Sequence, residues 1–318
     1  MPLWDEAAKI SLGGVEVYAF GLFAALGTAA AFGVIGFLSK RRQLKAGTAS
    51  LTTLLCILIG GLVSRIVFCL LNRDLGFMMP LFSWFQITGG GWSMMGLVGG
   101  CMLAAWLSAK WLGEKPGQTL DLAGCALPVF MMFERAAERW IPEFDYSRAL
   151  ESEWLGRSFL AIQDGPDANL ATWRLAAAFA AGLFIWLFVC AMTNPGRPGD
   201  ICIRFLLFFG AGSVILESLR YDMFLSISFV GIQEILALVI LCAGVIAAVR
   251  QAEPGLQRLK TAALVSLPVA GLIGLGLEFA LDRTTINKFL IYAVMIAVMF
   301  TPAFLGLRLI RRKGIKQA

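Results

Sequence analysis

The amino-acid sequence predicts an all-α integral membrane protein, a polytopic helical bundle of about nine transmembrane helices. Of its 318 residues, 58% are hydrophobic and 15% are charged, whereas soluble domains average roughly 45–50% and ~25%. The mean hydropathy is +0.77. Apolar stretches run along the whole chain, with short polar joints between most of them. This composition excludes a water-soluble domain.

Nine apolar segments account for the predicted helices. A helix that crosses the bilayer needs ~20 mostly apolar residues, and each segment meets this except the fourth, which is short and contains Asp121. In chain order the predicted spans are residues 14–38, 50–71, 92–112, 119–134, 171–192, 201–219, 225–249, 261–281 and 288–309. The first seven belong to a predicted membrane domain, residues 1–255. The last two, with a basic cytoplasmic tail, make up residues 256–318.

The distribution of basic residues predicts how the chain crosses the membrane. More than half of the 27 Lys and Arg residues lie in alternate joints: SKRRQLKAGTA, AKWLGEKPGQ, TNPGRPGD, RQAEPGLQRLK and the tail from Arg308. By the positive-inside rule, these joints face the cytoplasm, with the N-terminus outside and the C-terminus inside. Contact with an anionic leaflet explains the net charge of +6. No nucleic-acid partner is therefore expected.

One predicted outer segment, residues 134–170, is much longer than the other outer joints. It interleaves acids and arginines with Trp140, Tyr146 and Trp154. Aromatic residues in an amphipathic stretch favour a position on the outer interface, with the apolar face among the headgroups. A solvated loop with incidental aromatics is the alternative.

Four arginines near the outer ends of predicted spans mark the candidate site. A charge within the hydrocarbon costs ~2.5–3.5 kcal/mol and usually faces the bundle interior or a polar cavity. Guanidinium matches two phosphate oxygens at once, so several at one depth indicate a lipid phosphate site. The alternative is that they snorkel to the interface, or pair with Glu134, Glu138 and Glu217. The four are Arg65, Arg135, Arg174 and Arg220.

The chain has no histidine and seven cysteines. The first fact excludes a Ser-His-Asp triad, a Cys-His pair and His-ligated metal. The cysteines fall in apolar stretches without C-x-x-C spacing, so they are interpreted as small buried hydrophobic residues. A glycine-rich stretch, TGGGWSMMGLVGG, leads into the third span. It indicates either close helix packing or backbone N–H groups directed at an anion.

The order of several blocks resembles a family. These are GGLVSRIVF, GGWSMMG, ERAAERWIPEF, LESLRYD and SISFVGIQEILAL, which follow the order and spacing of blocks in bacterial phosphatidylglycerol–prolipoprotein diacylglyceryl transferases. The resemblance covers about residues 12–250. It implies that residues 1–255 form a membrane domain like that of this family, with seven helices. The helices after residue 255 have no counterpart in it.

The resemblance assigns site residues one position at a time. Arg135 falls on the arginine of the family signature, Ala137 on its small residue and Glu143 on its glutamate. The predicted phosphate-site residues are Arg135, Arg220, Glu217, Gly90, Gly91 and Tyr18, to which the clustering of arginines adds Arg65, and the predicted catalytic-site residues are Glu143, Glu138, Ser93 and Met95. Gly96 completes the glycine block. No metal and no cofactor are implied.

The chain also departs from the family pattern. Met95 stands where the family has its functional histidine, and Phe20 stands where it has a functional tyrosine, with Tyr18 as a substitute. Glu138 and Ile141 replace two signature asparagines, and Tyr146 replaces a glycine. Glu143 or Glu138 is then a candidate base, unless the thiolate forms near the arginines without one.

The implied activity is diacylglyceryl transfer from phosphatidylglycerol to the lipobox cysteine of preprolipoproteins. The site would face the outer leaflet of the bacterial plasma membrane, with phosphatidylglycerol, the lipobox segment and the bilayer as partners. A family member that has lost catalysis and only binds lipid or lipoprotein is the first alternative, motivated by Met95. An anion transporter is the second, although the arginines cluster toward one side of the membrane.

Overall fold

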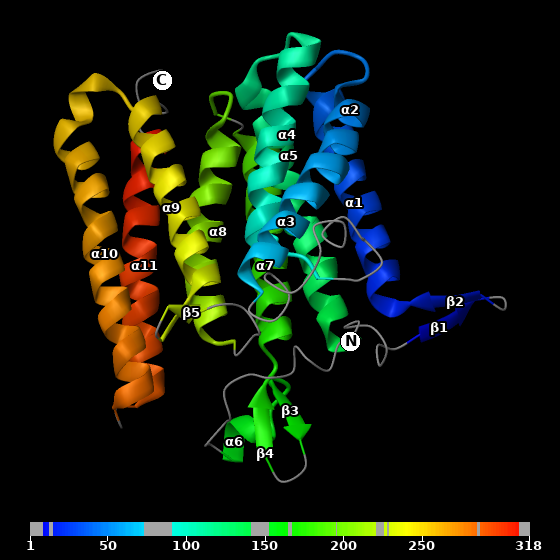
Figure 1. The fold of residues 1–318 in the computed structure, drawn as a ribbon. Coiled ribbons are helices and arrows are strands. Elements are labelled where there is room, and N and C mark those ends of the chain that lie inside the picture. The colour runs from blue at the N-terminus through cyan, green and yellow to red at the C-terminus, as the bar shows by residue number, and fades with distance from the viewer. Residues whose placement is uncertain are drawn as a thin grey trace.

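The computed structural model confirms the polytopic helical architecture. It describes residues 9–12, 15–72, 91–140, 153–164, 167–194, 196–220, 226–227, 229–284 and 287–311. Within these ranges nine long helices run up and down beside one another (Figure 1). They are α1 Ala19–Arg41, the continuous helix of α2 Thr48–Leu55, a π-helical turn Cys56–Gly60 and α3 Gly61–Leu71, α4 Met94–Leu112, α5 Pro116–Ala137, α7 Thr172–Thr193, α8 Asp200–Ser218, α9 Ile232–Gln251, α10 Gln257–Arg283 and α11 Lys288–Arg311. Eight of the described helices are long and apolar enough to cross a membrane, and α5 is the ninth.

Helix α5 tolerates an acid in its span because Asp121 holds the start of α8. Asp121 is 1% exposed, and its carboxylate accepts the backbone N–H groups of Gly199 and Cys202 at 3.1 and 3.0 Å. Arg42 at the end of α1 donates to the same carboxylate at 2.8 Å. A carboxylate is stabilised at a helix N-terminus, where backbone N–H groups lack partners. Asp121 therefore joins α1, α5 and α8 at one end of the bundle.

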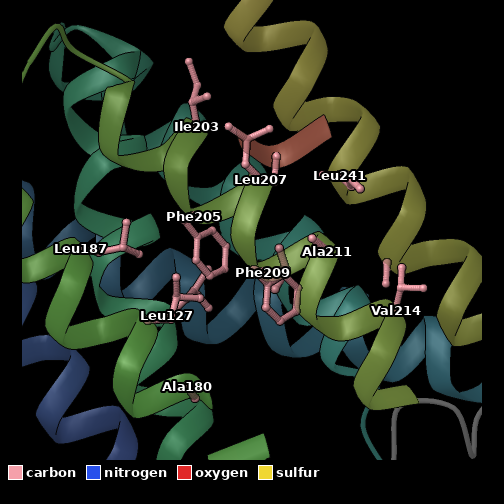
Figure 2. Packing of buried hydrophobic residues seen from close by; sticks show 14 of the residues in the cluster. Leu127, Ala180, Leu187, Ile203, Phe205, Leu207, Phe209, Ala211, Val214 and Leu241 are labelled. Atoms are coloured by element: carbon pink, nitrogen blue, oxygen red, sulfur yellow. The ribbon is translucent and has the colours of Figure 1, made fainter. Parts of the chain in front are cut away.

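Helix α8 is the centre of the bundle. It contacts α5, α7, α9 and α11, and Figure 2 shows its apolar side chains beside those of α5, α7 and α9. Gly210 approaches α9 so closely that an added Cβ would lie 2.6 Å from the backbone nitrogen of Leu241. Such small residues let membrane helices pack at short range.

Three short hairpins correct the sequence prediction at the helix ends. They are β1 Lys9–Leu12 with β2 Val15–Tyr18, β3 Ala161–Asp164 with β4 Asp167–Leu170, and β5 Ser226–Ile227 with β6 Val230–Gly231. The predicted spans 14–38 and 225–249 therefore begin too early. Val15–Tyr18 alternates in polarity, Val-Glu-Val-Tyr, which is the strand period. Gly231 precedes α9, where Glu234 accepts its N–H at 3.4 Å.

The two ends of the bundle differ in the way that the basic residues predict. The hairpins and the short helix α6 Glu153–Gly156 lie at one end, and α6, β3 and β4 project beyond the helices (Figure 1). The joints predicted to face the cytoplasm lie at the other end, with the C-terminus. The two ends are called here the hairpin end and the basic end. Of the predicted interfacial segment 134–170, residues 141–152 lie outside the described residues.

The two C-terminal helices pack directly on the rest of the bundle. Helix α11 contacts α8 and α9, and α10 contacts α9 and α11. Met295 and Met299 of α11 are buried in the same apolar cluster as α8. At the hairpin end, the Tyr292 hydroxyl donates to the backbone oxygen of Ser218 at 3.3 Å. The added helices are thus joined to the end of α8, close to the charged residues described next.

Candidate functional site

Five charged side chains meet at the hairpin ends of α5 and α8, at or just past the last helical residues. We call Glu134, Arg135, Glu138, Glu217 and Arg220 the charge cluster. Arg135 is 7% exposed and Glu138 is 3% exposed, so the cluster is buried. Two of the four predicted arginines, Arg135 and Arg220, are brought together here.

Arg135 is the hub of the cluster because it faces all three carboxylates. Its Nη1 donates to Glu138 Oε1 at 2.5 Å, and its Nη2 donates to Glu217 Oε1 at 3.4 Å. Its Nε lies 3.5 Å from Glu134 Oε2. Arg220 donates from Nη1 and Nη2 to Glu138 Oε1, both at 3.3 Å. The structure therefore shows these two arginines paired with acids, which was the alternative considered from the sequence. Phosphate binding by Arg135 and Arg220 stays a prediction.

The charge balance of the cluster favours proton uptake. Three carboxylates surround two guanidinium groups, so one negative charge is not compensated within the cluster. Burial raises the pKa of the Glu138 carboxyl just past α5, and Glu134 and Glu217 add to this shift against the opposing effect of Arg135. A buried carboxyl with a raised pKa is a common general base. The cluster thus combines groups able to hold an anion with groups able to take a proton.

A large apolar cavity lies beside the charge cluster. Its volume is about 540 Å³, within the ~300–1,000 Å³ typical of ligand sites. One face of α1 lines it from Phe20 to Ile35, which corresponds to about 22 Å of helix at ~1.5 Å per residue. The facing walls come from the π-helical turn, α3, α4 and α5. Its length and apolar walls suit an acyl chain.

Glu134 connects the cavity to the charge cluster. It lines the cavity on the α5 side, and it belongs to the cluster through Arg135. Its Oε2 atom is buried and makes no hydrogen bond to the described part of the chain. Tyr18 at the start of α1 also lines the cavity. A ligand in the cavity would therefore contact the Glu134 side chain, whose carboxylate can accept a proton.

A second, much smaller hollow lies on the α7 side of the cluster. Its volume is about 10 Å³, and Arg135, Glu217 and Arg220 are among its lining residues. This is close to the space that one water molecule needs. It does not offer room for a lipid headgroup as the side chains stand.

Arg65 lies at a different place, the junction of α3 and α4. Its Nη1 donates to the backbone oxygen of Gly91 at 3.0 Å, and its guanidinium lies 5.5 Å from the Phe68 ring. Gly91 has a φ of +82°, and an added Cβ would overlap the Phe68 ring. Glycine is therefore required there by both backbone and space.

Ser93 caps the first turn of α4 at the same junction. Its Oγ accepts the Gly96 N–H at 3.3 Å and the Gln233 amide Nε2 at 3.2 Å. Ser64 Oγ donates to the Ser93 backbone oxygen at 2.8 Å. An added Cβ on Gly96 would lie 2.9 Å from the Ser64 Cα. The glycine-rich stretch thus allows close helix packing. The Ser93 hydroxyl accepts the Gly96 N–H, which is one of the backbone groups that the sequence suggested could bind an anion.

The remaining predicted residues fall in three situations. Met95 is 4% exposed within the apolar core and is absent from the cavity lining. Arg174 lies apart, with its guanidinium 4.5 Å from the Phe159 ring and 4.8 Å from the Trp173 ring, donating to the backbone oxygens of Phe159 and Ala161. Gly90 and Glu143 lie outside the described residues.

Sequence reasoning missed Glu134 as the acid that reaches the cavity, and it missed Ser64 and Gln233 altogether. The available signal was their polarity within apolar stretches: each interrupts a predicted span or its end. Glu134 was considered only as a partner for the arginines. Whether the face of α5 that carries Glu134 borders the cavity depends on how α1 and α5 pack.

Together these features define a class, a polytopic helical membrane protein with a buried charge cluster beside an acyl-sized cavity. A family model of prolipoprotein diacylglyceryl transferase matches residues 7–250. The chain belongs to this family of transferases, and it is a multi-pass inner-membrane protein. The family acts on a lipid donor and preprolipoprotein substrates in the membrane. No curated protein matches the chain.

Proposed function

We propose that this protein transfers a diacylglyceryl group from phosphatidylglycerol to the lipobox cysteine of preprolipoproteins at the outer leaflet. The observation that carries the proposal is the contact of the 540 Å³ apolar cavity with Glu134, and through it with Arg135. A diacyl lipid needs an apolar space for its chains directly next to groups that handle a phosphate and a proton.

The chemistry assigns a task to each part of this arrangement. The lipobox sulfur forms a C–S bond to the terminal glyceryl carbon, while the bond from that carbon to the phosphate oxygen breaks. Glycerol 1-phosphate leaves, and the thiol proton passes to a carboxylate. We assign this proton to Glu134, whose Oε2 has no hydrogen bond among the described residues. Glu138 and Glu143 remain the bases that the sequence alone suggests.

Arg135 and Arg220 are proposed to stabilise the charge of the departing phosphate. Preorganised guanidinium groups in a buried site can do this without a metal. Their donors are directed at carboxylates in the structure. Proton transfer to Glu134 removes the negative charge that lies 3.5 Å from Arg135 Nε, which leaves more of the positive charge of Arg135 to stabilise the phosphate in the same step. This coupling also gives a role to the uncompensated charge in the cluster.

The family histidine is replaced by Met95, which supports a second candidate, a protein that binds lipid or lipoprotein without transfer. Met95 is buried in the apolar core and cannot accept a proton. Glu134 is the group we propose to act in place of the histidine. The two candidates differ in one outcome, the formation of lipidated peptide.

The role of the cavity is tested by filling it. Ala24 lines the cavity from α1, whereas Ala29 on the same helix is exposed and does not line it. Ala24→Phe is expected to reduce transfer at least tenfold with long-chain phosphatidylglycerol, and to reduce it less with short-chain donors. The measurement is kcat/KM for purified protein with donors of graded chain length. Ala29→Phe is the matched control and should behave like the wild type at every length.

An equal loss for short and long chains in Ala24→Phe, or the same loss in Ala29→Phe, would contradict the assignment of the acyl chain to this cavity.

A further inference from the structure

A buried arginine lies at the basic end of α8, far along the helix from the charge cluster. Arg204 is 6% exposed, and its Nε is buried without a hydrogen bond within the described ranges. Asp200, one turn earlier, lies close enough for its charge to interact with that of Arg204, but its carboxylate accepts its hydrogen bonds from the Arg197 N–H and the Gln251 amide, both at 2.8 Å. A buried guanidinium with a donor that lacks an acceptor is costly in a membrane protein. Arg204 is therefore expected to bind an anion.

An aromatic surface begins one helical turn from Arg204. Phe208 of α8 contacts Trp186 of α7, with ring centroids 4.7 Å apart, and Phe304 of α11, at 5.4 Å. Phe300 of α11 lies 5.8 Å from Phe208. We call Trp186, Phe208, Phe300 and Phe304 the aromatic patch. Phe304 is 52% exposed, so the patch reaches the lipid-facing surface of the bundle.

A second arginine borders the aromatic patch at the same end. Helices α8 and α11 run in opposite directions (Figure 1), and Phe208 meets Phe304 between them. Arg204 lies four residues from Phe208 on α8, and Arg308 lies four residues from Phe304 on α11. Both steps run toward the basic end. A four-residue step keeps the same helix face and advances about 6 Å. Arg308 is exposed, so a buried and an exposed guanidinium both lie one turn beyond the patch.

We propose that the aromatic patch, Arg204 and Arg308 bind one anionic phospholipid of the cytoplasmic leaflet. The phosphate lies on the two guanidinium groups, and an acyl chain lies over the aromatic rings. A cationic end that continues into an exposed aromatic surface on transmembrane helices fits an anionic amphiphile better than a soluble anion. The site is at the opposite end of the bundle from the charge cluster. Phe300, Phe304 and Arg308 also lie beyond residues 7–250, the part matched by the family model.

Trp186 provides a direct probe of this site. The full-length protein in detergent micelles is titrated with phosphatidylglycerol or phosphatidylcholine that carries brominated acyl chains, which quench nearby tryptophan. The chain has nine tryptophans, so the Trp186 signal is taken as the difference between the wild type and Trp186→Phe. Brominated phosphatidylglycerol should quench this signal at a lower mole fraction than brominated phosphatidylcholine.

Substitutions of Arg204 test whether its charge produces the preference for the anionic lipid. Arg204→Gln should raise the half-quenching mole fraction of phosphatidylglycerol about fivefold, the effect of ~1 kcal/mol per arginine, whereas Arg204→Lys should keep most of the preference. Ala24→Phe, at the cavity of the hairpin end, should leave the Trp186 signal unchanged. Equal mole fractions for the two lipids, or no shift in an Arg204→Gln protein with wild-type circular dichroism, would overturn the proposal. Displacement of the lipid by millimolar inorganic phosphate would instead identify a soluble-anion site.

Discussion

Replacing Arg135 by glutamine is expected to lower kcat for diacylglyceryl transfer by about 10²–10³-fold, the loss seen when a preorganised group that stabilises transition-state charge is removed. Arg135 faces Glu134, Glu138 and Glu217 within 3.5 Å. The measurement is single-turnover transfer by purified Arg135→Gln protein. Arg139→Gln is the matched control, because Arg139 is exposed and only four residues away.

The same variant is expected to be less stable, so stability and catalysis must be separated. Removing one partner of a buried ion pair costs about 3–5 kcal/mol, because it leaves carboxylates without their counter-charge. The double variant Arg135→Gln/Glu138→Gln removes one of these carboxylates as well. We expect it to recover much of the thermal stability without recovering activity. Recovery of both together would mean that Arg135 only holds the fold.

Glu134→Gln is expected to lower kcat by about 10²–10⁴-fold, the usual contribution of a general base. Glu134 lines the cavity, and its Oε2 makes no hydrogen bond within the described ranges. The amide has nearly the same shape but cannot take the thiol proton. The loss in kcat should exceed any change in the KM for lipid, since the chains contact other residues.

The pH dependence distinguishes a base from a binding group. Without a base the reaction uses thiolate formed in solution, and the thiolate fraction rises about tenfold per pH unit below a thiol pKa of ~8.5. The defect of Glu134→Gln should therefore shrink as pH rises toward that value. Glu138→Gln, which removes the acceptor shared by Arg135 and Arg220, should show a defect that does not shrink with pH. The opposite pattern would return the base role to Glu138.

The bundle was predictable from the sequence because each span is defined by local composition. Nine apolar segments gave nine long helices among the described residues, including α5 with its buried Asp121. Only the ends were wrong, where the short strands Val15–Tyr18 and Val230–Gly231 precede α1 and α9. Hydropathy averages over many residues, so it does not detect a four-residue strand next to a helix.

The charged residues of the candidate site could be named from the sequence, but most of their contacts could not. The structure shows Arg135 and Arg220 paired with Glu134, Glu138 and Glu217, which the sequence offered only as the alternative to a phosphate site, and it places Arg65 and Arg174 elsewhere. The sequence did not indicate which of the three acids lines the cavity and which one contacts both arginines. This depends on the face of α5 that packs against α1, which brings Glu134 to the cavity. A single sequence carries no direct signal for such a contact.

We propose that this chain transfers a diacylglyceryl group although it has no histidine. The most direct measurement uses wild-type protein in lipid nanodiscs with phosphatidylglycerol and a peptide that contains a lipobox cysteine. Mass spectrometry should find a peptide carrying one diacylglyceryl group, with one glycerol phosphate released per peptide and no product from the Cys→Ser peptide. Bound phosphatidylglycerol without any lipidated peptide would contradict the claim and establish a protein that binds lipid without transferring it.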